Sequence, residues 1–261
     1  MNTIEQVFQQ KQTFVGFIVG GDGGIDYCTD TCLQMIEGGV DILEIGLPFS
    51  DPIADGPVIQ RASQRALKCG TTPSTILEIA RRIRKKSTAP LILFSYFNPL
   101  LKQGDGYLKA LKSAGFDAVL VIDLPPPLQQ ENHPYFQALE TAGLLPIFVV
   151  TPSTEENRLT QIASISQGFL YYACQKGTTG ARDQLPDDVS FHISRIRQKT
   201  DLPVAIGFGI ADQKSASSAL TAAHGFVVGS AFVKLMEEGA VPHELKMLAQ
   251  TLDPRPKETR A

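Results

Sequence analysis

Two carboxylates in the N-terminal part of the chain are candidates for proton-transfer chemistry. Glu44 lies near the end of the apolar run 40–45, and Asp55 follows in a loop that also holds Asp51 and three prolines. Partial burial raises the pKa of a carboxyl group, so that it can carry a proton near neutral pH. A structural ion pair is the alternative for Glu44, but the predicted strands contain no Lys or Arg to form one. We therefore interpret Glu44 as a general acid–base and expect the proline-stiffened loop to place Asp55 over the same cavity.

Glycine-rich segments follow three predicted strands and indicate an anion site. They are residues 177–180, 207–209 and 229–230. Glycine lets backbone N–H groups approach a phosphate, and Ser230 adds a hydroxyl donor. Turns alone would explain glycines in one loop, but they explain three successive strand ends less well. Residues 207–209 lack the third glycine of a dinucleotide-binding fingerprint, so the pattern favours a simple phosphate.

Other polar groups also fall at predicted strand ends. Asp123 ends one such run, where it either takes part in the chemistry or orders its loop, and the sequence leaves both open. Tyr171 and Tyr172 lie on another run.

Several chemistries are excluded by residue type and place. The four histidines lie in predicted helices or loops away from strand ends, which disfavours a metal site. No strand carries a lysine for a Schiff base, and no GxSxG motif is present. The four cysteines have no CxxC spacing and fit buried thiols. Acid–base chemistry by carboxylates on a phosphorylated small molecule remains.

The elements that position these residues repeat along the chain. Eight short apolar runs, rich in Val, Ile, Leu and Phe, fit parallel strands covered on both faces: residues 14–19, 40–45, 91–95, 118–122, 146–150, 169–173, 203–206 and 226–228. Helical patterns lie between them, at residues 26–37, 73–86, 107–114, 134–142, 155–165, 187–199, 213–222 and 231–236. Alternation along the second run places Ile42, Glu44 and Gly46 on one face, with Glu44 in the mouth of the sheet.

Eight strand–helix units in a chain of 261 residues predict an α/β fold of the (β/α)8 TIM barrel type. A doubly wound open sheet is the main alternative. We expect one barrel domain over residues 1–251, with an extra N-terminal helix at 1–10 covering the bottom of the barrel. Residues 252–261 are rich in proline and charge, and we expect a flexible C-terminal tail there.

Charge and hydropathy bound the partners. The formal net charge is −3 and 43% of the residues are hydrophobic, which excludes a nucleic-acid footprint and a disordered chain. The N-terminus is polar and no apolar run is long enough to span a bilayer. We expect a cytoplasmic protein without a signal peptide, and no membrane or nucleic-acid partner.

Residues 43–57, LEIGLPFSDPIADGP, resemble the signature of the tryptophan synthase alpha subunit. Shorter motifs that extend the resemblance along almost the whole chain lie at 96–99, 123–125, 179–180, 207–210 and 229–231. The chain departs from the usual family pattern at Gly23, at Pro126-Pro127-Leu128 and over residues 174–178. None of these departures touches Glu44 or Asp55.

The resemblance implies a carbon–carbon lyase that cleaves indole-3-glycerol phosphate to indole and glyceraldehyde 3-phosphate. Its implied catalytic residues are Glu44 at indole C3, Asp55 at the indole N–H and Tyr171 beside the reacting carbons. The other residues carried over from the family are Gly180, Gly209, Gly229 and Ser230 for the phosphate, Phe17, Phe94 and Phe208 for the indole, and Thr179 on a mobile loop that closes over Asp55.

The same resemblance implies a partner. The family pairs this subunit with a β subunit in an αββα heterotetramer, and indole passes between them for the synthesis of L-tryptophan. Asp51 and Pro52 are implied at that interface. No cofactor is implied in this subunit, whereas pyridoxal phosphate is expected in the β partner.

Two other functions remain open from the sequence. A subunit that has lost catalysis and only activates its β partner would not need Glu44, Asp55, Tyr171 and the phosphate glycines, so their presence favours an active lyase. Another phosphate-binding barrel enzyme, such as an isomerase of the same pathway, would not need the acidic loop after the second strand.

Overall fold

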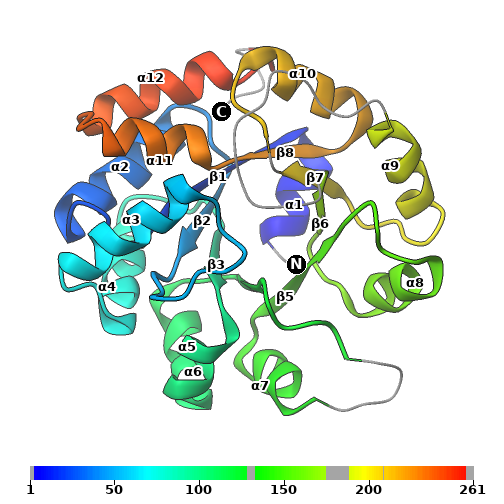
Figure 1. Cartoon of the computed structure of the whole chain (residues 1–261), viewed down its shortest axis with the longest axis horizontal. Coiled ribbons are helices and arrows are strands. Elements are labelled where there is room, and N and C mark those ends of the chain that lie inside the picture. The colour runs from blue at the N-terminus through cyan, green and yellow to red at the C-terminus, as the bar shows by residue number, and fades with distance from the viewer. Residues whose placement is uncertain (1–2, 128–132, 175–187, 208, 257–261) are drawn as a thin grey trace.

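The computed structural model describes residues 3–127, 133–174, 188–207 and 209–256. Within these ranges eight parallel strands form a closed barrel in which each strand pairs with the next and β8 pairs with β1 (Figure 1). The strands are β1 Thr13–Val19, β2 Ile42–Gly46, β3 Leu91–Ser95, β4 Ala118–Val121, β5 Leu145–Val150, β6 Leu170–Ala173, β7 Val204–Gly207 and β8 Gly225–Val228. The predicted TIM barrel is confirmed, and the open-sheet alternative is wrong because β8 closes on β1.

Helices surround the barrel and fill the intervals between strands (Figure 1). In chain order they are α1 Thr3–Gln10, α2 Ile25–Glu37, α3 Pro57–Lys68, α4 Pro73–Arg84, α5 Phe97–Gln103, α6 Asp105–Ala114, α7 Pro134–Ala142, α8 Glu156–Ile165, α9 Val189–Arg197, α10 Gln213–Ala222, α11 Ser230–Glu237 and α12 Pro242–Leu252. Glycines with positive φ end α6 and α7 at Gly115 and Gly143, where a left-handed residue stops a helix at little cost.

Side chains alternate between the barrel interior and the helix layer. On β2, Ile42 packs in the interior cluster, whereas Leu43 and Ile45, and Leu47 just after the strand, pack under the helices. The strands carry apolar residues on both faces because both faces are covered, which is why they read as continuous apolar runs in the sequence. This alternation sets Glu44 on the interior side of β2.

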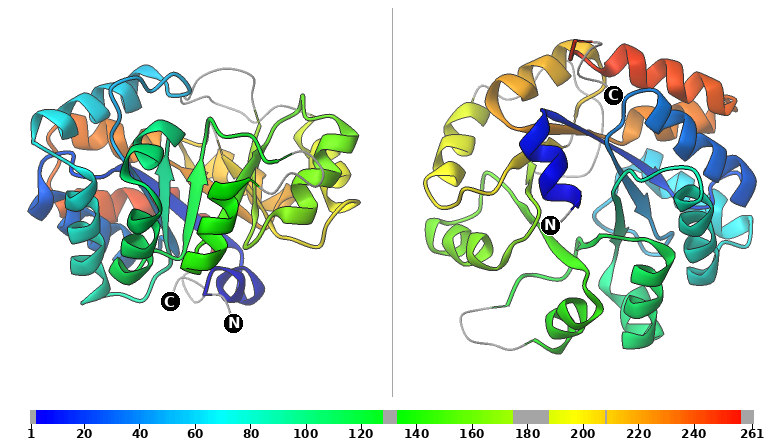
Figure 2. Two further views of the ribbon diagram at one scale, coloured as in Figure 1. Left: turned by 90° about the horizontal axis from the view of Figure 1, so that it is seen from below. Right: turned by 180° about the vertical axis from the view of Figure 1, so that it is seen from behind.

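Helix α1 covers one end of the barrel, as predicted. Ile4 and Phe8 belong to the interior cluster, and the ring of Phe8 lies 5.1 Å from that of Phe169. In the left panel of Figure 2, α1 lies at the end opposite the β2–α3 loop. The plugged end is the N-terminal end of the strands, so the open mouth lies at their carboxyl ends.

The sequence patterns missed three helices: α3, α5 and α12. Helix α3 starts with Pro57 at its first turn and buries Ile59, Ala62 and Ala66. Asp, Pro and Gly just before it suggested a loop and hid this apolar spacing. A proline at the first helical position is itself a helix-start signal, because its missing N–H has no intrahelical partner there.

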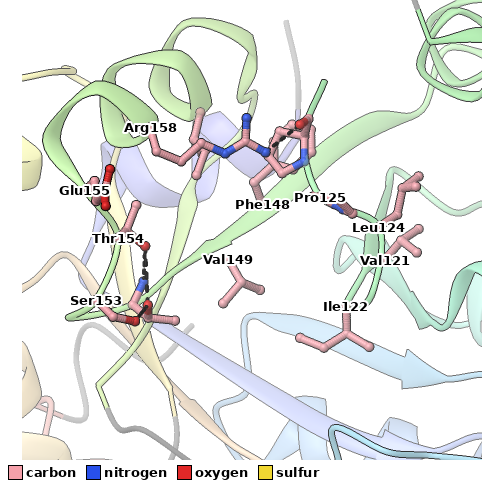
Figure 3. Close-up of a pocket in the computed structure, with 13 residues that line it drawn as sticks. Val121, Ile122, Leu124, Pro125, Phe148, Val149, Ser153, Thr154, Glu155 and Arg158 are labelled. Carbon is pink, nitrogen blue, oxygen red and sulfur yellow. Dashed lines mark hydrogen bonds between the residues drawn. The ribbon is translucent and has the colours of Figure 1, made fainter. Parts of the chain in front are cut away.

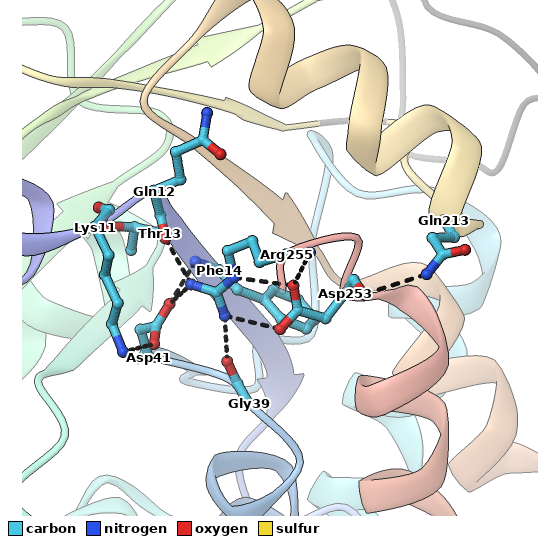
Figure 4. A network of polar contacts seen from close by, with 9 residues as sticks. All are labelled: Lys11, Gln12, Thr13, Phe14, Gly39, Asp41, Gln213, Asp253 and Arg255. Carbon is cyan, nitrogen blue, oxygen red and sulfur yellow. Dashed lines mark hydrogen bonds and ion pairs between the residues drawn. The ribbon is translucent and has the colours of Figure 1, made fainter. Parts of the chain in front are cut away.

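The expected flexible tail is wrong for its first part, because Leu252 ends α12 and residues up to Pro256 are ordered against the barrel. Asp253 is fully buried and Arg255 is 3% exposed. Arg255 binds Asp253, Asp41 and the carbonyl oxygens of Gln12 and Gly39 (Figure 4). A proline-rich, charged composition suggested disorder, but these charges are partners of one another. Residues 257–261 lie outside the described part.

Candidate active site

Glu44 lies in the barrel interior near the open mouth. It pairs in register with Phe17 on β1 and Ile92 on β3, and it is 1% exposed. Burial raises the pKa of Glu44 to about 8. Its Oε1 atom has no hydrogen-bond partner among the described residues. A buried, protonated carboxyl group with an unengaged oxygen is suited to donate a proton to a bound substrate.

Asp55 is also buried, although it belongs to a loop. It is 6% exposed, and its carboxylate Oδ2 accepts a hydrogen bond of 3.0 Å from the hydroxyl of Tyr96. Burial raises the pKa of Asp55 to about 6, while the hydrogen bond from Tyr96 acts in the opposite direction. Because its pKa remains below 7 whereas that of Glu44 lies above 7, Asp55 is largely ionised at neutral pH and Glu44 is largely protonated.

Tyr171 connects the two carboxyl groups electrostatically. It lies on β6 in the interior cluster, and its pKa is raised first by burial and then by the neighbouring acidic groups Glu44, Cys174 and Asp55. The structure therefore brings these three predicted catalytic residues into one electrostatic environment. Tyr172, the next residue, points the other way and packs in the cluster under the helices.

Aromatic rings line the mouth beside Glu44. Phe17 and Phe94 meet edge to face, with ring centroids 5.3 Å apart. A β-carbon placed on Gly46 or on Gly229 would lie 3.1 Å from the Phe17 ring. Glycine at these two positions leaves room for the ring, which therefore borders the predicted phosphate site at Gly229.

Gly229 and Ser230 form the N-terminus of α11, at the end of β8. Gly229 is the residue before the helix, and Ser230 is its first residue. Unpaired N–H groups and the helix dipole make such an end favourable for an anion. Gly209, also predicted for the phosphate, has a φ of 92°, a conformation that favours glycine. Gly180, Thr179 and Phe208 lie outside the described residues.

The loop that carries Asp55 also presents an exposed surface. Asp51 is exposed, Pro52 is half-buried and Ile53 is 80% exposed. The hydroxyl of Ser50 donates to Asp51 Oδ2 at 2.5 Å. The two acids of this loop thus differ in their surroundings, since Asp55 is buried against Tyr96 and Asp51 is exposed to solvent.

A cavity of about 540 Å3 opens next to this site, between the ends of β4 and β5 (Figure 3). The β4–β5 pairing ends at Leu120 and Ile147, although β5 continues to Val150. Ile122 and Val149 line the cavity, and Arg158 donates to the carbonyl oxygen of Pro126 at 2.5 Å on its rim. None of the predicted catalytic residues lines this cavity, although its lining residue Val149 pairs in register with Tyr171 on β6.

Asp123 has a structural contact. Its Oδ1 accepts a hydrogen bond of 2.7 Å from the backbone N–H of Phe97. This bond joins the end of β4 to the start of α5. The sequence left open whether Asp123 takes part in the chemistry or orders its loop, and this contact supports the second role.

Sequence reasoning gave no role to Tyr96, although it contacts Asp55 directly. Tyr96 follows the last residue of β3 and is 3% exposed. The rule that polar residues at barrel strand ends are functional would have found it. A tyrosine hydroxyl stays neutral near pH 7, so its sequence position alone does not mark it as a proton carrier.

The loop after β1 also differs from the usual family pattern. Gly23 has a φ of 78°, which proline cannot adopt. Asp22 beside it is buried and binds Arg65 of α3 through two hydrogen bonds of 2.6 and 2.9 Å. Arg65 also reaches Glu237 of α11 at 2.8 Å. This network ties the helix after Asp55 to the helix that begins at Ser230.

The described ranges contain neither a candidate metal site nor a candidate membrane span. No group of three or more His, Cys, Asp or Glu residues is placed to hold a metal ion. No helix in the same ranges is both long and apolar enough to cross a membrane.

Comparisons with known proteins agree on one family. The family described as "Tryptophan synthase alpha chain" matches residues 4–258. A tryptophan synthase alpha chain from Chlamydia felis is 55% identical over 256 residues, which covers 98% of this chain and 100% of that protein. One from Coxiella burnetii is 47% identical and covers 97% and 98% of the two chains. A solved tryptophan synthase from Mycobacterium tuberculosis has a TM-score of 0.87 at 29% identity, over 96% of each chain.

Barrel, mouth and comparisons lead to one conclusion: the chain belongs to the tryptophan synthase alpha chain family.

Proposed function

We propose that Glu44 and Asp55 together cleave indole-3-glycerol phosphate at the mouth of this barrel. The chain is a carbon–carbon lyase of the tryptophan synthase alpha type, and its products are indole and glyceraldehyde 3-phosphate. The observation that carries the assignment of residues is the opposite state of the two carboxyl groups. Burial holds a proton on Glu44, whereas Asp55 keeps a donor from Tyr96 and is largely ionised.

The reaction needs both states. Breaking the carbon–carbon bond requires a proton at indole C3 and removal of a proton from the neighbouring glycerol hydroxyl. Protonated Glu44 delivers the first, and as a carboxylate it then accepts the second, so the cycle returns it to its starting state. The indole N–H gains positive character when C3 is protonated, and ionised Asp55 stabilises it. Tyr171 packs beside the reacting carbons and limits the water that reaches them.

The rest of the mouth binds the two ends of the substrate. We assign the indole ring to Phe17 and Phe94, which form an edge-to-face aromatic pair beside Glu44. We assign the phosphate to Gly209, Gly229 and Ser230, where a helix N-terminus and glycine backbone can approach it. Gly180, Thr179 and Phe208 are assigned by resemblance alone.

The partner is a tryptophan synthase β subunit. A solved structure of similar fold carries the description tryptophan synthase, without restriction to one subunit, which supports a partner for this chain. We propose an αββα heterotetramer in which Asp51 and Pro52 lie at the interface, beside the exposed Ile53. The chemistry of this chain uses no cofactor, and in this family pyridoxal phosphate resides in the β subunit. We place the complex in the cytoplasm and assign the whole activity to one barrel domain.

An assay of indole release tests the proposal. Purified chain is mixed with indole-3-glycerol phosphate, and indole is measured with and without the β subunit. We expect release in both cases and faster release with the partner. If indole never forms, while the chain still accelerates L-tryptophan formation from added indole by its partner, the chain is a non-catalytic activator and the proposal is wrong.

A further inference from the structure

One hydroxyl group holds Asp55 and the loop that carries it. The phenol oxygen of Tyr96 donates to Asp55 Oδ2 at 3.0 Å and accepts a hydrogen bond of 3.0 Å from the backbone N–H of Ala54. A hydroxyl has one proton to give and lone pairs to accept, so both contacts can form at once. The side chain and the backbone of two successive loop residues therefore share one anchor.

Tyr96 is itself rigidly placed. It directly follows β3 and precedes the first residue of α5, which fixes its backbone at the edge of the barrel. Its ring packs on Phe49 with centroids 5.4 Å apart. The bond from Phe97 N–H to Asp123 secures the next residue as well. The hydroxyl thus belongs to the scaffold, whereas Asp55 belongs to a loop.

The loop has few other constraints on this side. Asp55 N–H donates to Pro52 within the loop, and Gln60 of α3 donates to the carbonyl oxygen of Asp55 at 2.8 Å. Both contacts fix the backbone of Asp55 but not the direction of its carboxylate. Among the hydrogen bonds formed by the described residues, the one from Tyr96 orients that carboxylate.

We propose that Tyr96 is a positioning residue for the lyase reaction, which fixes the Asp55 carboxylate so that Oδ1 faces the indole N–H. The inference rests on the proposed function and assigns it a further residue. Tyr96 engages Oδ2, so the other carboxylate oxygen is the one available to substrate. An oriented carboxylate stabilises the developing charge without reorganisation, which is where such groups contribute most to rate.

The same contact keeps Asp55 ionised. Burial raises its pKa to about 6, and the hydrogen bond from Tyr96 stabilises the charged form. The other titratable groups facing this region are Glu44 on β2, Tyr171 on β6 and Asp123 at the end of β4. Glu44 raises the pKa of Tyr171, and Asp123 raises the pKa of Tyr96. Added negative charge from these groups would raise the pKa of Asp55. Loss of the Tyr96 hydroxyl therefore moves this pKa upward.

The test compares Tyr96→Phe with Tyr107→Phe. Both tyrosines are buried, and Tyr107 also donates one hydrogen bond of 3.0 Å, to the carbonyl oxygen of Pro73 on the outer side of the barrel. For Tyr96→Phe we expect kcat for indole release to fall about 10- to 100-fold, the range for a hydrogen bond to a charged group, with a smaller change in KM. The acidic limb of the pH–rate profile should move to higher pH by about one unit. Tyr107→Phe should leave both unchanged.

A double mutant separates positioning from a general loss of structure. In the Asp55→Asn background, adding Tyr96→Phe should cost less than threefold, because its target carboxylate is already gone. A loss as large as in the wild-type background would show that Tyr96 acts independently of Asp55, and the inference would be wrong. An unchanged kcat and pH profile in the single variant would also overturn it.

Failure of the inference can be told apart from failure of the proposed function. The pKa of Asp55 is measured directly from its carboxyl 13C signal during a pH titration, which needs no turnover. An increase of about one unit in Tyr96→Phe supports the anchor even in a preparation that releases no indole. If wild type and Tyr107→Phe are active and the Asp55 pKa is the same in Tyr96→Phe, the inference alone fails.

Discussion

The hydroxyl of Tyr171 occupies the space that a side chain at position 207 would need. A β-carbon built on Gly207 would lie 2.1 Å from the Tyr171 hydroxyl oxygen and 2.3 Å from the ring carbon that bears it. The two residues lie on neighbouring strands, β6 and β7, at their carboxyl ends. Gly207 was expected to serve phosphate binding through its loop. The structure gives a second reason for glycine at position 207, because any side chain there would clash with Tyr171.

Gly207→Ala is expected to displace Tyr171 and lower activity. The Tyr171 ring is 7% exposed and has little room to move, so the added methyl group should cost about 1–3 kcal/mol in stability through overpacking. We expect a loss of kcat for indole release, because the tyrosine moves relative to Glu44. Thermal unfolding and steady-state kinetics measure the two effects.

Gly106→Ala is the matched control for that variant. A β-carbon at position 106 of α6 would meet nothing within 4 Å. Alanine stabilises a helix relative to glycine, so this variant should be at least as stable as wild type and fully active. If Gly207→Ala were also as stable and as active as wild type, the close approach of Gly207 and Tyr171 would contribute nothing to stability or activity.

Glu44→Gln should abolish indole release while the chain still binds its β partner. Glutamine fills the same space but cannot carry a proton to C3, and general acid–base groups contribute about 10²–10⁴-fold to rate. The exposed loop around Ile53 is untouched by this change, so association with the β subunit should be retained in gel filtration. A variant that releases indole at near wild-type rate would assign the proton transfer to another group.

Asp55→Asn should remove the stabilisation of the indole N–H. We expect a loss of about 3–4 kcal/mol in transition-state stabilisation, the scale for one preorganised electrostatic group. The neutral amide can still bond to Tyr96, so folding should be little affected. kcat/KM measures the loss, and a change below tenfold would mean that Asp55 has no electrostatic role.

The sequence predicted most of the fold because the barrel repeats one simple pattern. Strands such as β3 Leu91–Ser95 matched to the residue, since apolar residues on both faces leave one interpretation. Helix α3 was missed because Asp, Pro and Gly before it are also turn residues. The ordered segment around Arg255 was missed because its partners, such as Asp41, are far away in sequence. Local patterns carry no information on such pairs.

The acidic residues of the site could be predicted from the sequence, but the residues that contact and position the catalytic groups could not. Glu44 could be chosen because few of the predicted strand ends carry an acid, whereas Asp55 was chosen from the position of its loop after that strand and from the family resemblance. Their surroundings depend on which atoms meet, such as the Tyr96 hydroxyl at Asp55 or the Tyr171 hydroxyl at Gly207. No periodicity or spacing reports these contacts, so they came only from the three-dimensional structure.

Burial of Glu44 should make stability depend on pH. Its pKa is about 8 when folded, against an ordinary value of 4.5, so the folded state holds a proton that the unfolded state has lost. The contribution of protonated Glu44 to the free energy of unfolding is therefore complete below pH 4.5 and is lost as pH rises toward 8. Glu44→Gln removes this dependence. Urea unfolding measures the free energy of unfolding at several pH values. Between pH 4.5 and pH 8 this free energy should fall in wild type relative to the variant, and above pH 8 the difference should be constant. A constant difference over the whole range would mean that Glu44 is not protonated when folded.

Arg255 is expected to be a large contributor to stability although it lies close to the C-terminus. Its guanidinium group binds Asp253 at 2.9 and 3.0 Å and the carbonyl oxygens of Gln12 and Gly39 at 2.6 and 2.7 Å, and it also contacts Asp41 (Figure 4). Arg255→Met keeps much of the apolar stem but leaves Asp253 buried without its cation. Removing one partner of a buried ion pair costs about 3–5 kcal/mol, which we expect in the free energy of unfolding from urea titrations.

Lys246→Met provides the control for this variant. Lys246 on α12 pairs with Glu37 on α2 at 3.1 Å, but the Glu37 side chain is 54% exposed. Solvent screens such a pair, so its loss should leave the urea midpoint nearly unchanged. Both variants remove one positive charge, so a difference between them reports burial rather than net charge. Equal, small effects would show that the segment around Arg255 contributes little to the fold, whereas a large loss confined to Arg255→Met would establish it as part of the barrel's closed end.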